Sequence, residues 1–424
     1  MKILAIETSC DETSIALIEK NESGKYQVLS HETISQINLH REFGGVYPTL
    51  SRREHEKNLI PLLHKVLKDS NLLQEKNQQE SLESFDSLIL EKLGTDVELL
   101  ERYPDLKENT FDFFSKYELS EKIDFIAVTN GPGLPPALWV GVNFAKVISI
   151  LFSIKNKNIP IYPINHMEGH IIGGISHRLE NIVEIPKINY PAICLLISGG
   201  HTELVLSSES GKYEKIGETM DDAVGEAYDK VARLLGLPYP GGPEIGRLAK
   251  ISREHFQVGT NFPELVPFPR PMLHSKDFNF SFSGLKTHIL YLTQRIKPKD
   301  LDPEEPGNDY LIHNPFNGGM DISIAGEFEE AVKDVLIYKT KKSLEETGAN
   351  SLVVGGGVAS NHYLKENFEK LTNDLGMDLY YSAKDLATDN ALMIALTCAN
   401  QIENGVQPTE SVNFIAIGSK NYEW

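Results

Sequence analysis

The sequence predicts an α/β protein of two lobes with mostly parallel sheets. Its 424 residues exceed the size that one hydrophobic core usually supports, so two domains are expected. A strand–polar turn–strand unit opens the chain, and a second such unit begins at residue 193. Later strands alternate with helices, which is typical of parallel α/β sheets. These observations together predict two duplicated halves that face each other.

The two repeated units share one pattern of apolar and small polar residues. The first is ILAIETSCDETSIALIE, in which two β-rich runs flank the polar residues between Thr8 and Ser14. The second is ICLLISGGHTELVLS, residues 193–207, in which Ser198, Gly199, Gly200 and Thr202 form the turn. Each unit is therefore expected to open one lobe with a pair of strands.

Two strand–loop–helix segments also repeat. Residues 122–152 read as a strand, a Gly/Pro loop and a helix. The apolar stretch 137–152 contains Asn143 and Lys146 and is too short to span a membrane, so we expect a buried helix. Residues 351–371 repeat the order, with three glycines at the junction and Ser360 as the expected helix N-cap.

The expected domain limits follow these repeats. The N-terminal lobe is predicted over 1–135 and the C-terminal lobe, with the metal and nucleotide motifs, over 136–400. For residues 401–424, a return to the first lobe is one option. Residues 71–120 carry 12 acidic and 5 basic side chains and are interpreted as a decorative surface insertion. The Pro- and Gly-containing stretch 296–320 is interpreted as a loop.

Charge and cysteine content limit the partners and the compartment. The formal net charge of −19, from 41 basic and 60 acidic residues, repels a phosphate backbone, so a nucleic-acid substrate would need a local basic patch or a basic partner. Three distant cysteines without a CxxC pair fit a reducing cytoplasm. Glu7 interrupts the only apolar run at the N-terminus, which argues against a signal peptide. We expect a cytoplasmic protein without a membrane segment.

A pair of histidines indicates a metal site. His166 and His170, in NHMEGH, are spaced i and i+4, so on a helix both imidazoles lie on one face, about 5–6 Å apart at Cβ. Asp389, in ATDN, can add an oxygen ligand, and such a set leaves open positions for substrate. The alternatives are a chance HxxxH spacing and, for Asp389, simple capping of the helix that follows.

Glycine-rich turns indicate contacts with phosphate or nucleotide. The turn Ser198–Gly200 lets backbone N–H groups approach an anion without obstruction by Cβ atoms. The 355–357 glycines precede a helix N-terminus, which favours the same ligand, although a tight turn needs no ligand. Asp229, within a helical run, can bridge ribose hydroxyls or belong to a solvated charged face.

Eight motifs occur in one order along the chain: IETSCDETS, TNGPG, NHMEGH, SGGHTEL, GETMDDAVGEAYDKVARLLGLPYPGGP, FSFSGLKT, GGGVASN and ATDN. Together they closely resemble the TsaD family, the bacterial tRNA adenosine threonylcarbamoyltransferase subunit. The resemblance covers nearly the whole chain except about 71–120 and 296–320.

The resemblance implies two duplicated actin-like lobes, of the sugar kinase/heat-shock ATPase and ribonuclease-H-like type, with the active site in a central cleft. It implies transfer of a threonylcarbamoyl group from threonylcarbamoyl-adenylate to N6 of the adenosine next to the anticodon, position 37, in tRNAs that read codons beginning with A. AMP is released. The implied partners are tRNA, a paralogous dimerising TsaB-like subunit and a small TsaE-like P-loop ATPase.

The resemblance also implies roles for residues of this chain. His166, His170 and Asp389 hold one divalent metal ion, with iron favoured by the resemblance, although this ligand set alone does not separate iron from zinc. The positions implied to bind the adenine nucleotide are Leu196, Ile197, Ser198, Gly199, Gly200, Asp229, Gly242 and Asn361.

The catalytic candidates are two carboxylates in the first turn. If the two-lobed arrangement holds, Asp11 and Glu12 point toward the active site, where one of them orients or deprotonates the attacking amine. Their alternative role is stabilisation of the turn. Two rival functions are a metallopeptidase, disfavoured because Glu168 is not placed as in HExxH, and a nucleotide-binding scaffold without catalysis, disfavoured because both histidines and the three carboxylates are present.

Overall fold

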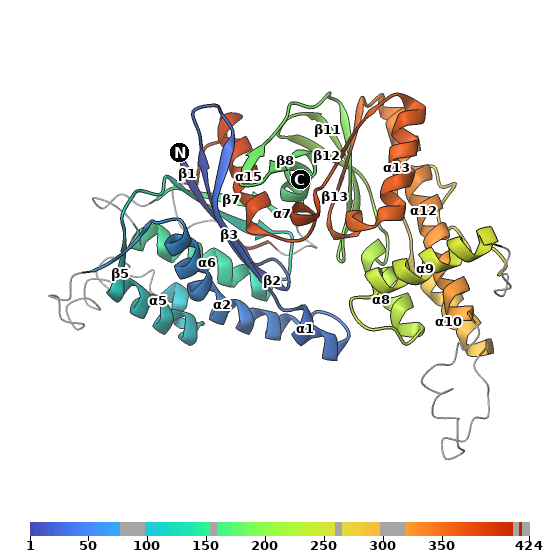
Figure 1. The fold of residues 1–424 in the computed structure, drawn as a ribbon, viewed down its shortest axis with the longest axis horizontal. Coiled ribbons are helices and arrows are strands. Elements are labelled where there is room, and N and C mark those ends of the chain that lie inside the picture. The colour runs from blue at the N-terminus through green and yellow to red at the C-terminus, as the bar shows by residue number, and fades with distance from the viewer. Residues whose placement is uncertain (77–97, 153–158, 259–264, 297–318, 410–414, 418–424) are drawn as a thin grey trace, which may run out of the picture. The chain divides into compact units, whose positions relative to one another are not determined.

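The computed structural model describes residues 1–76, 98–152, 159–258, 265–296, 319–409 and 415–417. The chain divides into two compact units: residues 1–187 with 383–424 form unit 1, and residues 188–382 form unit 2. Each unit contains one mixed sheet with helices packed against it (Figure 1). Among the described residues, no helix is long and apolar enough to cross a membrane.

Unit 1 is built on a seven-stranded sheet in the order β7-β6-β1-β2-β3-β9-β8. Its strands are β1 (Lys2–Glu7), β2 (Glu12–Lys20), β3 (Tyr26–Ser35), β6 (Phe125–Gly131), β7 (Ile161–Asn165), β8 (His177–Leu179) and β9 (Ile182–Glu184). Its helices are α1 (Ile37–His40), the 3-10 helix η1 (Arg41–Phe43), α2 (Pro48–Asp69), α4 (Glu98–Glu101), α5 (Pro104–Lys116), α6 (Pro135–Leu151), α7 (His166–Ile175), α14 (Lys384–Ala387) and α15 (Ala391–Glu403).

Two helical layers cover the sheet of unit 1. Leu4 and Ile6 of β1 belong to the hydrophobic core that also contains the apolar residues of α2 and α6. Ile3 and Ala5 alternate with them and are also fully buried, because successive side chains of a strand point to opposite faces. Helix α15 packs against β1 and β2, and α7 packs against α15. As expected from the sequence, α6 is a buried helix.

Unit 2 is built on a five-stranded sheet in the order β12-β11-β10-β13-β14. Its strands are β10 (Ala192–Ile197), β11 (Thr202–Glu209), β12 (Lys212–Glu218), β13 (Ser351–Gly355) and β14 (Asp378–Tyr381). Its helices are α8 (Val224–Leu234), α9 (Gly241–Val258), α10 (Ser283–Ile296), α12 (Met320–Thr347), the 3-10 helix η3 (Gly357–Ser360) and α13 (His362–Leu375). Ile193, Leu195 and Ile197 of β10 share one core with these helices.

The duplication expected from the sequence is confirmed by the topology. In unit 1, β1 pairs antiparallel with β2 and parallel with β6, which pairs parallel with β7. In unit 2, β10 pairs antiparallel with β11 and parallel with β13, which pairs parallel with β14. Each sheet thus contains a three-stranded meander extended by two parallel strands on the side of its first strand. This repeated arrangement agrees with the two duplicated lobes expected from the sequence.

The limits of the two units differ from the limits expected at residues 135 and 400. Residues 136–187 belong to unit 1, since β7 pairs with β6 and β9 pairs with β3. The chain returns to unit 1 at Ala383, where the polypeptide enters α14 and α15. Unit 2 is therefore an uninterrupted segment between two parts of unit 1. The metal motif and the nucleotide motifs, expected in one lobe, belong to different units.

The interpretation of residues 71–120 as surface decoration is wrong for the described part of that segment. Strand β4 (Leu73–Glu75) pairs with β5 (Tyr117–Leu119). Apolar side chains of α4 and α5 are buried in the core of unit 1. They are Leu100, Leu106, Phe113 and Phe114. Residues 77–97, and residues 297–318 of the expected loop at 296–320, lie outside the described residues.

This packing predicts that Leu106→Ala lowers the free energy of unfolding of the protein by about 2–5 kcal/mol, because it removes buried methyl groups and leaves a cavity. Urea unfolding followed by circular dichroism measures the change. Glu108→Ala, an exposed neighbour on the same helix, serves as the control and changes stability by about 0.5 kcal/mol or less. Equal changes in stability for the two substitutions would contradict the burial of Leu106 and would support the interpretation of this segment as surface decoration.

Candidate metal centre and nucleotide-binding motifs

The two histidines of the candidate metal site begin a short buried helix. Strand β7 ends at Asn165, whose side-chain oxygen accepts hydrogen bonds from the backbone N–H groups of Met167 (2.8 Å) and Glu168 (3.3 Å). Asn165 is thus the N-cap of α7, and capping fixes where the helix starts. His166 is the first helical residue, so His170 lies one turn further on the same face.

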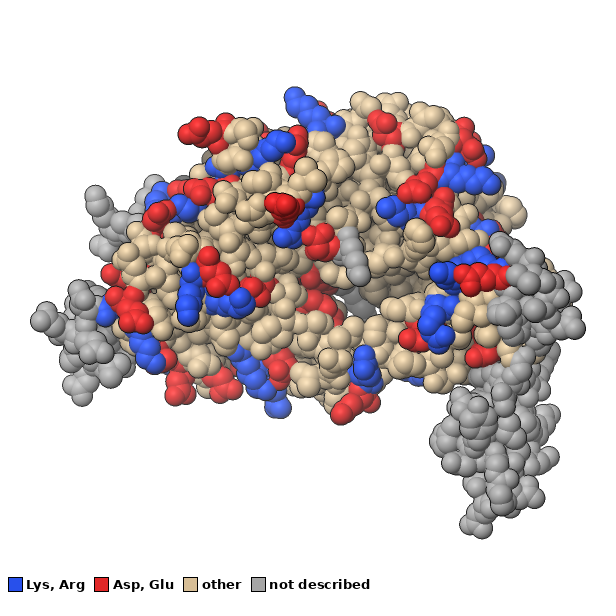
Figure 2. All heavy atoms as spheres, in the orientation of Figure 1, with Lys and Arg blue, Asp and Glu red and all other residues tan. Residues whose placement is uncertain are grey.

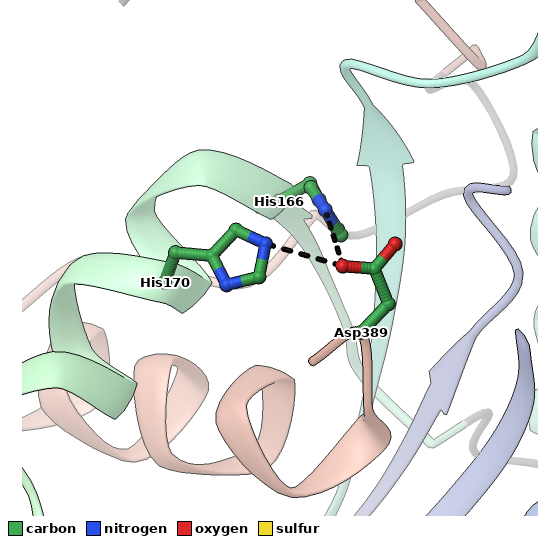
Figure 3. A group of neighbouring side chains, drawn as sticks. All are labelled: His166, His170 and Asp389. Atoms are coloured by element: carbon green, nitrogen blue, oxygen red, sulfur yellow. Dashed lines mark ion pairs between the residues drawn. The ribbon is translucent and has the colours of Figure 1, made fainter. Parts of the chain in front are cut away.

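The carboxylate of the site lies directly before α15. Asn390 caps α15, since its side-chain oxygen accepts from Met393 N at 2.9 Å, and its amide donates to Thr388 O at 2.6 Å. The capping alternative considered for Asp389 is therefore wrong, because Asn390 performs this role. Asp389 is left with its carboxylate directed at the two histidines (Figure 3).

Glycines allow α7 and α15 to approach each other. A Cβ atom at Gly169 would lie 3.1 Å from Ile394 Cδ1 and 3.2 Å from Met393 Cγ. A Cβ atom at Gly173, one turn on, would lie 3.3 Å from the backbone oxygen of Leu386. A side chain at either position would crowd these neighbours, so glycine permits the close packing of α7 against α14 and α15. The glycines of HMEGHIIGG thus have a packing function.

The three side chains converge as metal ligands do. Asp389 Oδ1 lies 3.4 Å from His166 Nε2 and 3.2 Å from His170 Nε2, and one ligand atom from each residue lies within 4.8 Å of the others. Metal–ligand bonds of about 2.0–2.2 Å at tetrahedral angles separate neighbouring ligand atoms by about 3.4 Å. Both contacts of Asp389 have this length, so the three side chains form a candidate site for one divalent ion.

The surroundings of His170 support this assignment. His170 is fully buried, and the carboxylate of Asp389, 3.2 Å from its Nε2, faces it. Burial lowers the pKa of His170, which favours the neutral imidazole that a metal ligand requires. The side chain of Asp389 is 22% exposed, so the site is open to solvent on the carboxylate side.

Glu7 orients His166 by contacting Nδ1, the ring nitrogen that does not face Asp389. The Nδ1 of His166 lies 3.1 Å from Glu7 Oε2 and 3.3 Å from Ser9 Oγ. A proton on Nδ1 that is donated to the carboxylate leaves the lone pair of Nε2 for an ion, which is the usual support of a metal-bound histidine. Glu7 also accepts from Ser9 N (2.5 Å) and from the hydroxyl of Thr129. Our sequence reasoning did not assign Glu7 to the site, although a carboxylate inside an apolar strand was a usable signal.

The pKa values reflect the excess of negative charge. Burial opposes protonation of His166, but the carboxylates of Asp389 and Glu7 raise its pKa well above the usual value. Burial raises the pKa of Asp389, but the two imidazoles outweigh this effect and lower it well below the usual value. Without an ion, a proton on His166 compensates the two carboxylates. A divalent cation compensates them more fully.

Asp11 and Glu12 lie together close to the metal site. The two side chains hydrogen-bond to each other, and Ser35 Oγ donates to Glu12 Oε1 at 3.0 Å. Burial, together with the charge of Asp389, raises the pKa of Asp11. Burial and the charge of Asp11 raise the pKa of Glu12 well above its usual value. Two adjacent carboxyl groups of this kind titrate as a pair, and the ionised pair has an increased affinity for one proton.

The predicted nucleotide residues of unit 2 include the turn between β10 and β11, which contains Ser198, Gly199 and Gly200. Gly199 and Gly200 are exposed, and a Cβ atom at either, or at Gly242, would meet nothing within 4 Å. A Cβ atom at Gly225, at the start of α8, would lie 2.6 Å from Ser198 O, so the turn and this helix N-terminus touch. Backbone N–H groups and helix N-termini in such a place suit an anionic ligand.

Four predicted nucleotide residues are engaged within the protein. The side chains of Leu196 and Ile197 are buried in the sheet, so only their backbone is available for a ligand. The carboxylate of Asp229 accepts hydrogen bonds from Gly241 N, at 2.7 Å, and from Gly242. Asn361, not the expected Ser360, caps α13 and accepts from Leu364 N at 3.2 Å. Its amide donates to the buried Glu329 Oε1 at 2.7 Å.

Comparison with known proteins gives one consistent result. A model of the TsaD family, described as tRNA N6-adenosine threonylcarbamoyltransferase, matches residues 27–77 and 110–396. Proteins of the same description from Nitrosospira multiformis and Thermosipho africanus are each 35% identical to this chain. The alignments cover 99% of this chain and 96% of the first protein, and 98% of this chain and 98% of the second.

A third protein of that description, from Persephonella marina, is 36% identical, with 94% of this chain and 89% of that protein covered. Among solved structures, full-length HypF in its phosphate- and nucleotide-bound form matches 96% of this chain and 47% of its own length. The TM-score is 0.41 at 13% identity, which is too low to bear on function.

The contact between Glu7 and His166 predicts that Glu7→Gln weakens metal binding about 10–100-fold, because an amide no longer fixes the Nδ1 proton of His166. Titration of the metal-free protein with Fe²⁺ or Zn²⁺ measures the dissociation constant. Glu168→Gln is the matched control, since Glu168 is a buried carboxylate of the same unit that accepts from Gln401 at 2.8 Å. Unchanged affinity in Glu7→Gln would mean that Glu7 does not support the ligand.

Proposed function

The chain belongs to the TsaD family of tRNA N6-adenosine threonylcarbamoyltransferases, and from this premise we propose that His166, His170 and Asp389 form the metal centre of the transfer. The activity is transfer of the threonylcarbamoyl group from threonylcarbamoyl-adenylate to N6 of the adenosine at position 37 of tRNA. The observation that supports the centre is the position of Asp389 Oδ1, which lies 3.4 Å from His166 Nε2 and 3.2 Å from His170 Nε2.

The resident ion in this proposal is divalent iron. Two imidazoles and one carboxylate suit iron and zinc alike, and the family resemblance favours iron. When bound, the ion acts as a Lewis acid toward oxygen atoms that become negative during the transfer. His166 and His170 supply neutral nitrogen ligands and Asp389 supplies charge, while Glu7 keeps the proton of His166 on Nδ1.

The bonds exchanged in the reaction define the task of Asp11 and Glu12. The N6 nitrogen of adenosine forms a bond to the carbamoyl carbon, the bond from that carbon to the phosphate oxygen breaks, and AMP leaves. N6 gives up one proton in the step. The ionised carboxylate pair accepts this proton and shares it between the two groups, and the raised pKa values of Asp11 and Glu12 favour that acceptance. We assign proton acceptance and orientation of the amine to this pair.

The nucleotide part of the donor is assigned to unit 2. The phosphate is assigned to Gly199, Gly200 and Gly242, because a Cβ atom at each would meet nothing within 4 Å and the backbone can be approached closely there. Asp229 and Asn361 act as neighbours that fix these loops, because their side chains already bond to helix N-termini. Leu196 and Ile197 contribute through the placement of β10.

The charge distribution bears on the partners. Figure 2 shows acidic and basic side chains interspersed on the face viewed, without one dominant basic area. With a net charge of −19, the chain gains little from nonspecific attraction to tRNA. We propose that tRNA binding depends on further subunits, a TsaB-like paralogue and a TsaE-like ATPase. The tRNA substrate and the three free cysteines support a cytoplasmic location.

The metallopeptidase alternative is further disfavoured by the direction of Glu168. Its carboxylate accepts from Gln401 Nε2 at 2.8 Å, whereas a peptidase base must activate water at the metal. A scaffold without catalysis would not need a carboxylate pair with raised pKa values beside the candidate metal site.

We expect Asp11→Asn to reduce transfer about 10²–10⁴-fold, which is the usual contribution of a general base, without loss of bound metal. The assay incubates the protein with tRNA, threonine, bicarbonate, ATP and the partner enzymes, and mass spectrometry of nucleosides counts the modified adenosine. Asp69→Asn, an exposed residue paired with Lys65, is the control. Full turnover by both Asp11→Asn and Glu12→Gln would remove the pair from the mechanism.

A further inference from the structure

A buried histidine of α2 binds both ends of the turn that carries the proposed catalytic pair. His55 is fully buried. Its Nε2 lies 3.1 Å from the carbonyl oxygen of Cys10, and its Nδ1 lies 2.8 Å from Thr13 Oγ1. Since a carbonyl only accepts, the proton resides on Nε2, and Nδ1 accepts from the hydroxyl of Thr13. One imidazole thus bridges the residues immediately before and after Asp11 and Glu12.

Ser51 and Gln36 add further hydrogen bonds to the same turn. Ser51, one helical turn before His55, donates from Oγ to Cys10 O and lies 3.1 Å from His55 Nε2. The backbone N–H of Gln36 donates to Asp11 O at 2.9 Å, and its side-chain amide donates to Ser51 O at 3.4 Å. The carbonyls of residues 10 and 11 are therefore both hydrogen-bonded, and none of these bonds uses the carboxylate of Asp11 or Glu12.

His55 stays neutral in these surroundings. Burial lowers the pKa of His55 to about 4, although the carbonyl of Cys10 and the charges of Glu7 on β1 and Glu54 on α2 oppose the shift. His40 of α1 lowers it further. A neutral imidazole with a fixed proton neither gives nor takes a proton near neutral pH, so its contribution is geometric.

We infer that His55 is a positioning residue of the transfer reaction, which acts by holding the 10–13 turn so that Asp11 and Glu12 face the attacking amine. This inference rests on the proposed role of that pair. Asp11 lies in the turn, while Glu12 and Thr13 begin β2 and pair with β3, so His55 ties the turn to the start of this strand. Misplacement of a reacting group by about 1 Å can reduce a rate about 10²-fold, so a clamp of this kind sets kcat rather than substrate affinity.

The test compares kcat, KM for threonylcarbamoyl-adenylate, KM for tRNA and bound metal in His55→Leu and in the wild type, within the reconstituted complex. We expect kcat to fall about 10²-fold, with both KM values changed less than about 3-fold and metal content unchanged. His55→Gln retains an amide that can donate to Cys10 O and recovers part of the rate. His64→Leu is the control on the same helix, where His64 packs against Phe113 and Tyr117, and it retains full kcat.

Thr13→Val provides a second route if His55→Leu does not fold, because it keeps the side-chain volume and removes only the hydroxyl that bonds to His55. It should lower kcat in the same way. If both variants lose kcat, bound metal and stability together, His55 has only a structural role and the inference is overturned. Unchanged kcat in folded His55→Leu would overturn it as well.

A combined variant separates this inference from the proposed function. In an Asp11→Asn, Glu12→Gln background, His55→Leu should cause no further loss, since the groups that it positions are already absent. If the double carboxylate variant keeps full turnover, the proposed role of the pair fails. If the double carboxylate variant is impaired but His55→Leu alone is not, only the positioning role fails. The positioning role also fails if His55→Leu lowers kcat of the double carboxylate variant by as much as it lowers kcat of the wild type.

Discussion

The close approach of α7 and α15 is the constraint on which the metal centre depends. Two glycines one turn apart remove the side chains that would separate these helices, and their missing Cβ atoms would otherwise contact Met393, Ile394 and the backbone of Leu386. Asn165 and Asn390 fix the starts of the two helices. With both helices placed and capped, the histidines at positions 1 and 5 of α7 meet the carboxylate that precedes α15. Residues more than 200 positions apart in the sequence thus reach one point.

The duplicated topology shows how one fold serves two chemical tasks. Asp11 lies in the turn between β1 and β2 and Glu12 begins β2, whereas the corresponding turn between β10 and β11 contains Gly199 and Gly200. Carboxylates in the first turn suit proton transfer, and glycines in the second suit approach of an anion. Charge distinguishes the units further, since the metal ligands and the carboxylate pair all belong to unit 1. The same backbone arrangement therefore supports different side-chain chemistry at equivalent positions.

The sequence was sufficient to predict what depends on local spacing. The i, i+4 histidines, the paired strand units and the buried helix 137–152 each follow from periodicity, and each is present in the structure. The domain limits were not predictable in this way, because unit 2 is inserted between parts of unit 1 and no proline- or glycine-rich linker marks Ala383. The role of Asn390 depends on which of two adjacent polar residues points at the helix N-terminus, which spacing does not decide. The burial of Leu106 and Phe113 depends on packing against α2, which is distant in the sequence. The acidic composition of residues 71–120 gave no sign of this packing.

The most direct test of the metal centre is anomalous X-ray diffraction from crystals of the metal-loaded protein, recorded above and below the iron absorption edge. A metal centre at these residues predicts one strong anomalous peak about 2.0–2.2 Å from His166 Nε2, His170 Nε2 and an oxygen of Asp389. A peak elsewhere on the chain, with these three side chains bonded only to one another, would contradict the assignment.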